Sequence, residues 1–409
     1  MKKEKYDLLQ KEIYQAVMDR MDYNKDLTDE EIAELIDNVI VEHNKVRTIE
    51  IEDRGRLKQE IFYAIRKLDV LQQFIENPDV TEIMVNGKDH IFIEKNGTLY
   101  ETGAKLFSEE KLDNLITQIV SKCNRRVNES SPIVDARLSD GSRVNVVMSP
   151  VSIDGSVVTI RKFPKNPITM GRLIEIGSIS QEAAAFLQKL VVCGYNIFIS
   201  GGTGSGKTTF LNALSGYIPR EERIITIEDS AELQLLDVPN LVRLETRNQN
   251  AEGCVEITIR DLIKTSLRMR PDRIIVGEIR GSEAIDLLQC LNTGHDGSMS
   301  TGHSNSAKDM LSRLETMVLM GMDLPLEAVR RQIASGIDIL VHLGRLRDKS
   351  RKVLQIVEIL EFRKGDIVLN TLYEYEEMGE NEERKVVGRL CKKAELSHTE
   401  KLMAAGVDI

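Results

Sequence analysis

Length, composition and charge set the first limits on this protein. Its 409 residues exceed what one hydrophobic core usually organises, so two or three domains are expected. The formal net charge of −10, from 55 basic and 65 acidic residues, weighs against a general nucleic-acid-binding protein. No apolar run approaches about 18 residues and the first residues hold no apolar signal core, so neither a membrane span nor secretion is expected. Five dispersed cysteines without a C-x-x-C pair favour a reducing cytoplasm.

The first part of the chain is predicted to contain two different regions. Residues 1–76 read as a helical N-terminal extension, because apolar side chains recur at helical spacing from Leu57 until Pro78 ends the pattern. Residues 77–163 then alternate polar and apolar side chains between turn signals, which is typical of β-hairpins. One helix interrupts these strands, and Ser108 is its predicted N-cap. The second region is therefore expected to be a small α+β domain.

The rest of the chain is predicted to hold a linker, a larger domain and a tail. Residues 164–179 carry two prolines and two glycines and read as the linker. Strands and helices alternate through residues 180–375, which indicates an α/β fold with a mostly parallel sheet, closed by antiparallel strands. Residues 376–409 are charged and weakly patterned, so a charged C-terminal tail is expected.

The segment "GGTGSGKT", which ends at Thr208, matches a phosphate-binding loop. An apolar strand precedes it and a helical pattern follows, as that loop requires. Its glycines allow backbone N–H groups to line an anion site, and the new helix adds its positive end. Lys207 is expected to reach the outer phosphates of ATP, and the Thr208 hydroxyl to bind Mg²⁺. The residues predicted to bind the nucleotide are Gly201, Gly202, Thr203, Gly204, Ser205, Gly206, Lys207, Thr208 and Thr209.

Two further apolar strands end in acidic residues, which hydrolysis of a bound triphosphate would need. "RIIVGEIR" places Glu278 at a strand end, and we assign it to polarising the attacking water. "IITIEDSAELQL" supplies Glu228 and Asp229 as predicted Mg²⁺ ligands, with Glu232 assisting. The alternative interpretation is that these carboxylates only cap the helices that follow the strands. Gly277 precedes Glu278 at a position where many such ATPases carry an aspartate for Mg²⁺.

Two histidines lie eight residues apart in "NTGHDGSMSTGHSNS", around a short predicted strand. A zinc pair is disfavoured because no cysteine or third histidine lies near His295 and His303. Two interpretations remain open. Both histidines hydrogen-bond the backbone at turns, or His303 senses the outer phosphate and moves its strand.

Three arginines lie on the predicted strands of the smaller domain: Arg137, Arg143 and Arg161. Ordinary surface arginines are one interpretation, because strands often carry them. The other is domain closure, since an arginine that reaches a γ-phosphate from another domain or subunit accelerates hydrolysis by about 10³- to 10⁵-fold.

Taken together, these motifs resemble the secretion and pilus-assembly ATPases of the type II/type IV superfamily, and most of all the CpaF-type branch that powers Tad (Flp) pili. The resemblance runs from about residue 77 to residue 347 and includes "NPDVTEIMVNG", "DARLSDGSRVN", "RLETR", "RDLIKTSLRMRPDRIIVGEIRGSEA" and "MVLMGMDLP". The chain lacks the cysteine quartet found in many type II secretion and type IV pilus extension ATPases, which favours the CpaF-type branch. It departs from the family at Gly302-His303-Ser304, where an apolar residue, His and Ala are usual.

The resemblance implies a RecA-like P-loop domain and roles for several residues. It places Glu228, Asp229 and Glu232 in the family's Asp box and His295 and His303 in its His box. It implies that Arg143 and Arg161 approach the nucleotide from the N-terminal domain, with Arg137 as a further candidate.

The resemblance also implies a function. The chain would be a Mg²⁺-dependent ATPase that forms a hexameric ring in the cytoplasm, at the inner face of the cell membrane. It would drive pilus assembly or protein secretion by acting on inner-membrane platform proteins of a Tad-type system. Two alternatives remain open, a nucleic-acid translocase or conjugation-type motor and a non-hydrolysing nucleotide switch. The intact Lys207, Thr208 and Glu278 argue against the switch.

Overall fold

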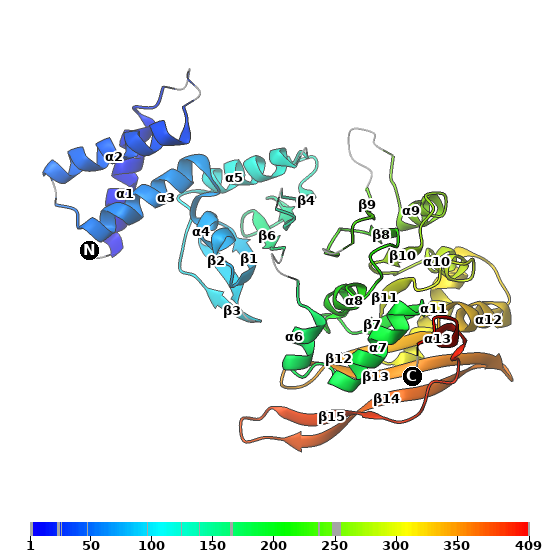
Figure 1. Ribbon diagram of the computed structural model, residues 1–409. Coiled ribbons are helices and arrows are strands. Elements are labelled where there is room, and N and C mark those ends of the chain that lie inside the picture. The colour runs from blue at the N-terminus through cyan, green and yellow to red at the C-terminus, as the bar shows by residue number, and fades with distance from the viewer. Residues whose placement is uncertain are drawn as a thin grey trace. The chain divides into compact units, whose positions relative to one another are not determined.

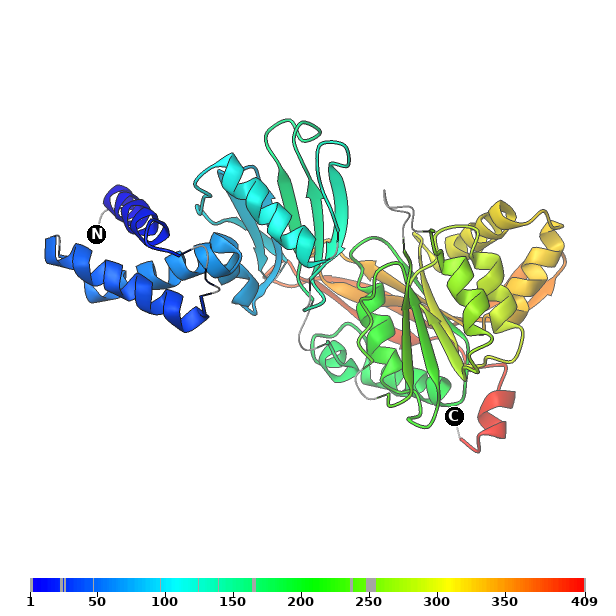
Figure 2. The ribbon, with the colours of Figure 1, turned by 90° about the horizontal axis from the view of Figure 1, so that it is seen from above.

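The computed structural model describes residues 3–22, 25, 27–46, 48–95, 97–123, 125–138, 140–163, 167–235, 238–247 and 255–407. The chain divides into two compact units, Met1–Lys165 and Asn166–Ile409. Figure 1 labels their elements, and Figure 2 shows the same ribbon from above. Among the described residues, no helix combines the length and the apolar character needed to cross a bilayer.

The first unit begins with helices that share a small core of their own. Leu9, Ile13, Ile36 and Leu57 are among the apolar side chains buried between them. The periodic apolar residues of the sequence therefore meet on the inner faces of the helices, as an amphipathic pattern requires. These helices are α1 (Lys3–Met18), α2 (Asp29–Val46) and α3 (Ile51–Arg66). The 3-10 turn η1 (Asp69–Leu71) and α4 (Gln72–Glu76) follow and pack against the core of the neighbouring sheet instead.

The first unit continues as a six-stranded antiparallel sheet that packs against helix α5 (Glu109–Lys122). Ser108 caps this helix as predicted, since its side chain accepts a hydrogen bond from the Lys111 backbone N–H at 3.0 Å. Buried and exposed side chains alternate along several strands, so one face of the sheet meets α5. In sheet order the strands are β3 (Thr98–Glu101), β2 (His90–Lys95), β1 (Val80–Asn86), β6 (Val157–Arg161), β5 (Arg143–Val147) and β4 (Ile133–Arg137).

The second unit is built on a nine-stranded mixed sheet. Six neighbouring strands, from β12 to β9 in sheet order, run parallel, and the other three extend the sheet as an antiparallel meander. This agrees with the predicted α/β fold. In sheet order the strands are β15 (Val386–Lys392), β14 (Asp366–Glu380), β13 (Arg351–Arg363), β12 (Ile339–Arg345), β7 (Ile197–Gly201), β11 (Met299–His303), β10 (Arg273–Val276), β8 (Ile224–Glu228) and β9 (Leu241–Glu245).

Helices cover both faces of this sheet, because alternate residues of its central strand point to opposite sides. Ile197 and Ile199 of β7 belong to the core formed with α7 and α8, whereas Phe198 joins the core formed with α9 to α12. Figure 2 shows helices on the two sides of the strands. The helices are α6 (Met170–Glu175), α7 (Gln181–Val192), α8 (Lys207–Ser215), α9 (Ile259–Ser266), α10 (Ala284–Leu291), α11 (Ala307–Gly321), α12 (Leu326–Gly336) and α13 (Glu400–Ala404).

Two regions differ from the sequence-based expectation. The predicted linker, of which residues 164–166 lie outside the described residues, contains helix α6. The predicted charged tail contains the end of β14, all of β15 and helix α13. Its strands carry many charged side chains because they lie at the edge of the sheet, where one face meets solvent.

A buried carboxylate fixes the chain after β15 to the core. Glu358 of β13 is 1% exposed and accepts hydrogen bonds from the backbone N–H groups of Ser397 at 2.9 Å and His398 at 2.7 Å. The side-chain amide of Asn370 donates a third bond at 2.9 Å. These donors come from distant parts of the sequence, so no local pattern could reveal them.

Replacement of Glu358 by alanine is expected to loosen this C-terminal segment. Three donors lose their acceptor inside the protein, which should cost about 2–4 kcal/mol of local stability. Hydrogen exchange at the amides of Ser397 and His398 should then accelerate at least about tenfold. The control is Glu361→Ala on the same strand, where the carboxylate is 60% exposed. Equal exchange in both variants would contradict the anchoring role.

Candidate functional site

The predicted phosphate loop connects β7 to α8, at the edge where the parallel strands end. Gly201 (φ 156°), Gly204 (φ 70°) and Gly206 (φ 93°) adopt conformations that side chains disfavour. A Cβ atom at Gly201 would lie only 2.5 Å from the carbonyl oxygen of Leu343. The loop thus needs glycine, and it leads directly into the N-terminus of a helix, where anions bind.

Lys207 is the first residue of α8 and is almost completely buried, with 7% of the residue exposed. Its ammonium donates to the Gly202 carbonyl oxygen at 3.1 Å and lies 3.1 Å from His303 Nδ1. Burial lowers the pKa of Lys207, and the nearby Glu278 carboxylate opposes this shift. The charged ammonium is a donor only, so Nδ1 of His303 must be the acceptor.

His303 connects this ammonium to the carboxylate of Glu278. Its Nε2 lies 2.9 Å from Glu278 Oε1. Burial, followed by the charge of Lys207, lowers the pKa of His303, which favours the neutral imidazole. A neutral ring that accepts at Nδ1 carries its proton at Nε2, which is the nitrogen that faces Glu278 Oε1.

The order of the strands explains why these three residues meet. Strand β11 lies between β7 and β10, and in the register of β11 with β7, His303 pairs with Gly201. The strand with the histidine therefore separates the phosphate loop from the strand that ends before Glu278. The carboxyl ends of parallel strands share one edge of a sheet, and ligands of such folds bind there.

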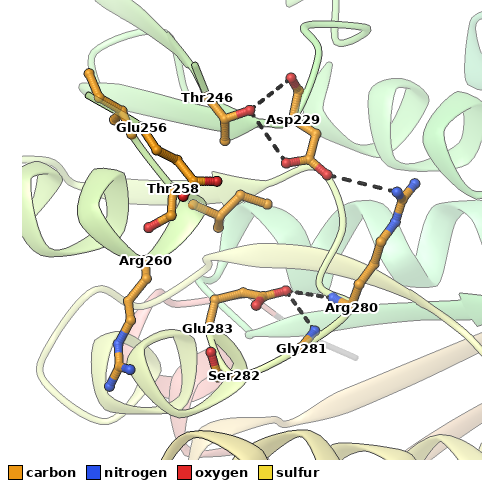
Figure 3. Close-up of a pocket in the computed structure, with 11 residues that line it drawn as sticks. Asp229, Thr246, Glu256, Thr258, Arg260, Arg280, Gly281, Ser282 and Glu283 are labelled. Carbon is orange, nitrogen blue, oxygen red and sulfur yellow. Dashed lines mark hydrogen bonds and ion pairs between the residues drawn. The ribbon is translucent and has the colours of Figure 1, made fainter. Parts of the chain in front are cut away.

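Arg280 extends the same chain of contacts, although the sequence analysis did not select it. Its guanidinium donates to Glu278 Oε2 at 3.0 Å and lies 3.8 Å from Asp229 Oδ2. Its position two residues after Glu278 was the available signal, because alternate side chains of an extended segment point the same way. Figure 3 shows Arg280 and Asp229 at a polar pocket of about 420 Å³, which Thr246, Thr258 and Glu283 also line.

Glu228 occupies a different environment from the one expected of a metal ligand. It is 3% exposed, and its Oε2 accepts hydrogen bonds from the backbone N–H groups of Glu232 at 2.7 Å and Leu233 at 2.9 Å. Burial raises the pKa of its carboxyl group. The geometry thus favours a structural role, in which Glu228 holds the turn after β8, over the predicted Mg²⁺ coordination.

Glu228 also explains the glycine that precedes Glu278. A Cβ atom at Gly277 would lie 2.9 Å from Glu228 Cγ, so the side chain of β8 occupies the space that an aspartate would need. The missing aspartate is therefore a consequence of packing between neighbouring strands.

The remaining residues fit a magnesium ion bound together with phosphates. Asp229 is exposed at the end of β8, and Thr208 lies in the first turn of α8. Across the described residues, no group of three or more His, Cys, Asp or Glu side chains is arranged to enclose a metal. Magnesium usually takes only one or two protein carboxylates and completes its shell with phosphate oxygens and water, so these residues match its requirements.

His295, which the resemblance places with His303 among the candidate site residues, does not lie beside His303 in this structure. It precedes β11, whereas His303 ends that strand, so the strand separates the two histidines. Its carbonyl oxygen accepts a hydrogen bond from the Ser298 hydroxyl at 2.7 Å, and the adjacent Asp296 pairs with Lys401 at 2.8 Å. The imidazole Nδ1 of His295 is buried without a hydrogen-bond partner among the described residues, so the structure does not show the predicted bond from this ring nitrogen to the backbone.

The three arginines of the first unit lie in one row across its sheet. Arg137 pairs in register with Arg143, and Arg143 pairs with Arg161. Directly opposed residues of antiparallel strands point to the same face, so the three side chains share a face of β4, β5 and β6. Glu82 continues the row opposite Arg161, and the two side chains approach to 3.5 Å. Sequence reasoning selected these arginines but could not show that they are neighbours.

Comparison with known proteins identifies the family. The family model described as Type II/IV secretion system protein matches residues 65–401. The chain belongs to this family. Its members are P-loop NTPases that act as secretion ATPases, so the resemblance to type II/type IV secretion ATPases, the nucleotide-binding enzyme and the α/β fold expected from the sequence are confirmed, whereas the CpaF-type branch is not resolved.

Individual members of the secretion ATPase family show how far the similarity extends. The chain is 32% identical over 310 residues to a putative conjugal transfer protein of Mycobacterium tuberculosis, covering 74% of this chain and 87% of that protein. It is 34% identical over 304 residues to the type IV secretion system protein PtlH of Bordetella pertussis, covering 68% and 89%. The crystal structure of the pilus retraction motor PilT with bound ADP has the same fold, with a TM-score of 0.51 at 19% identity over 83% of this chain and 86% of PilT.

The contact between Lys207 and Glu278 through His303 predicts a pH dependence. The pKa of His303 lies below its ordinary value of 6.5, so the ring gains a proton only as the pH falls below that value. The protonated ring cannot accept from Lys207, and kcat/KM for ATP should therefore decline on the acid side. In His303→Gln, whose amide can accept from Lys207 and donate to Glu278, this decline should weaken.

The control for this profile is His398→Gln, which alters a histidine outside the site with 47% of its side chain exposed. It should keep the profile of the unmodified protein. An unchanged acid limb in His303→Gln would show that another group controls it.

Proposed function

We propose that this chain is the ATP-hydrolysing motor subunit of a Tad-type pilus-assembly or secretion system, of the CpaF-type branch. The observation that carries this proposal is the continuous contact from Lys207 through His303 to Glu278, next to the phosphate loop. It connects a residue that would bind the outer phosphates to a carboxylate that would orient water. Such a connection serves hydrolysis, and a protein that only binds a nucleotide has no need of it.

The proposed roles follow from these positions. The glycine loop with Lys207, Thr208 and Thr209 binds the phosphates, and Glu278 orients the attacking water. Thr208 and Asp229 would hold Mg²⁺, which neutralises phosphate charge. Arg280 helps to place Glu278 and Asp229, since its guanidinium contacts both acids. The hydrogen bond to Glu278 and the charges of Asp229 and Glu232 raise the pKa of Arg280, and Glu232 is assigned an assisting role on this basis.

Neutral His303 is the proposed phosphate sensor. A change in the position of the Lys207 ammonium alters the donor that His303 Nδ1 contacts, and the ring connects this change to Glu278 through Nε2. Because His303 is the last residue of β11, the change also acts on the strand between β7 and β10. The sensor therefore couples the phosphate loop to the sheet.

The arginine row of the first unit supports the proposal that this unit contributes to hydrolysis. The three guanidinium groups share one face of adjacent strands, with Glu82 beside Arg161 at the end of the row, so this face concentrates positive charge that attracts phosphate groups. We propose that Arg137, Arg143 and Arg161 supply positive charge to the triphosphate when the units close, within one chain or between copies. ATP then favours the closed arrangement because it binds that arrangement better.

In this proposal the motor is a hexameric ring at the cytoplasmic face of the inner membrane. It pushes on platform proteins of the Tad-type system, and hydrolysis releases the closed arrangement. The family membership supports an oligomeric secretion ATPase. The motif set and the absent cysteine quartet support the CpaF-type branch.

The amide variant Glu278→Gln tests the role of the carboxylate. It should retain ATP binding but reduce phosphate release by roughly 10²- to 10⁴-fold, because the amide orients and polarises water poorly. Phosphate release and nucleotide affinity are measured on the same preparation. Glu327→Gln is the control, because its side chain on α12 is 72% exposed. Turnover near that of the unmodified protein in Glu278→Gln would exclude the assigned role.

A second candidate function is a conjugation-type motor that acts on DNA. It is favoured by the similarity to the mycobacterial protein that is named a putative conjugal transfer protein. The net charge of −10 opposes it.

Added DNA distinguishes the two motors. For a motor that acts on proteins, single- and double-stranded DNA should leave the ATPase rate unchanged at low salt. Stimulation by DNA that declines steeply with rising salt would favour the conjugation-type motor instead, because DNA binding releases counterions. Heparin serves as a control for an unspecific polyanion effect.

A further inference from the structure

Arg351, the first residue of β13, lies against the phosphate loop although it is 147 residues away in the sequence. Its Nε donates a hydrogen bond to the Gly204 carbonyl oxygen at 2.9 Å. Its Cδ lies 3.5 Å from the position that a Cβ atom at Gly206 would occupy. The side chain thus lies against Gly204 and Gly206, two of the three loop glycines with positive φ, and the proposed mechanism does not yet use it.

The hydrogen bond matters because of how a phosphate loop works. The N–H of the peptide that carries the Gly204 carbonyl, on Ser205, donates to the Gly202 carbonyl oxygen at 3.3 Å, so the Gly204 carbonyl oxygen points to the opposite side, where Arg351 is its donor and fixes the plane of this loop peptide. Gly204 has no side chain to restrict its peptide planes, so the orientation of its carbonyl depends on partners. A guanidinium is a strong partner, because its hydrogen bonds are charge-assisted.

The rest of the loop is fixed from the other side. The Gly202 carbonyl oxygen accepts from the Ser205 backbone N–H at 3.3 Å and from Lys207 Nζ at 3.1 Å. Gly202 therefore holds the inner side of the turn, and Arg351 holds the outward Gly204 carbonyl. Among these contacts, only the one from Arg351 comes from outside the β7–α8 segment.

We propose that Arg351 is a positioning residue of the nucleotide site. It holds the peptide between Gly204 and Ser205 in one orientation, so that the loop is already ordered for a nucleoside di- or triphosphate. Ordering the loop before binding reduces the entropy that binding would otherwise lose. This inference rests on the proposed function, because it assumes that the loop binds ATP and ADP.

The next residue of the strand provides a matched control. Lys352 is also cationic, and its Nζ donates to the carbonyl oxygen of Gly177 at 2.6 Å, outside the phosphate loop. Lys352→Ala therefore removes the same charge and a similar hydrogen bond from the same strand. A general effect of charge or of strand stability would appear in both variants.

The experiment measures ADP and Mg-ATP dissociation constants by calorimetry on the full-length protein, together with kcat and KM. In Arg351→Ala, both dissociation constants and KM should rise roughly tenfold, the size of one charge-assisted hydrogen bond, with kcat changed less than about threefold. Arg351→Lys should recover part of the affinity, because an ammonium can reach the same carbonyl. Lys352→Ala should bind both nucleotides like the unmodified protein.

Three results would overturn the inference. The first is unchanged affinity in Arg351→Ala, and the second is an equal loss in Lys352→Ala. The third is a loss for ATP that greatly exceeds the loss for ADP, which would indicate direct contact with the outer phosphate. If Arg351→Ala fails to fold by circular dichroism, Arg351→Lys decides: a KM above that of the unmodified protein at equal kcat supports the inference, and an unchanged KM overturns it. Failure of the unmodified protein to bind or hydrolyse ATP would instead refute the proposed function.

Discussion

The imidazole of His303 lies between the ammonium of Lys207 and the carboxylate of Glu278, and this contact depends on the strand order of the second unit. Three neighbouring parallel strands must end at one edge for it to exist, with β11 between β7 and β10. Burial lowers the pKa of the ring and favours its neutral form, so Nδ1 accepts from Lys207 while Nε2 carries the proton and faces Glu278. A change at the phosphate loop can therefore reach the residue that orients water without transfer of a proton.

The packing of Glu228 against Gly277 explains why a glycine precedes Glu278. The Glu228 side chain fills the space next to Gly277, which leaves no room for an aspartate there. Its carboxylate instead holds the turn after β8, and the exposed Asp229 follows in that turn. The two acids at the end of β8 therefore have different roles. The buried Glu228 supports the backbone, and the exposed Asp229 faces the pocket of Figure 3.

Cationic side chains at or beside the proposed nucleotide site come from several elements of the second unit. Lys207 belongs to the loop and helix that bind phosphates, Arg280 follows Glu278, and Arg351 comes from the antiparallel extension of the sheet. The first unit carries its own row of arginines on three adjacent strands. Because Lys207 and Arg280 belong to different elements, binding of one polyanion can restrain more than one element at once. This is the property that a motor needs to convert hydrolysis into movement.

The sequence by itself determined the features that depend on neighbouring residues. Glycines before Lys207, apolar strands that end in acids, and Ser108 before a helix are local signals, and each predicted its element or its chemistry. Only the tertiary structure decided that His295 is remote from His303, that Glu228 is buried, that Arg280 and Arg351 contact the site, and that the charged tail contains strands. These outcomes depend on strand order and register, which bring together residues far apart in the chain. Hydrophobic periodicity records which side of an element is buried, but it does not record which strand lies beside it.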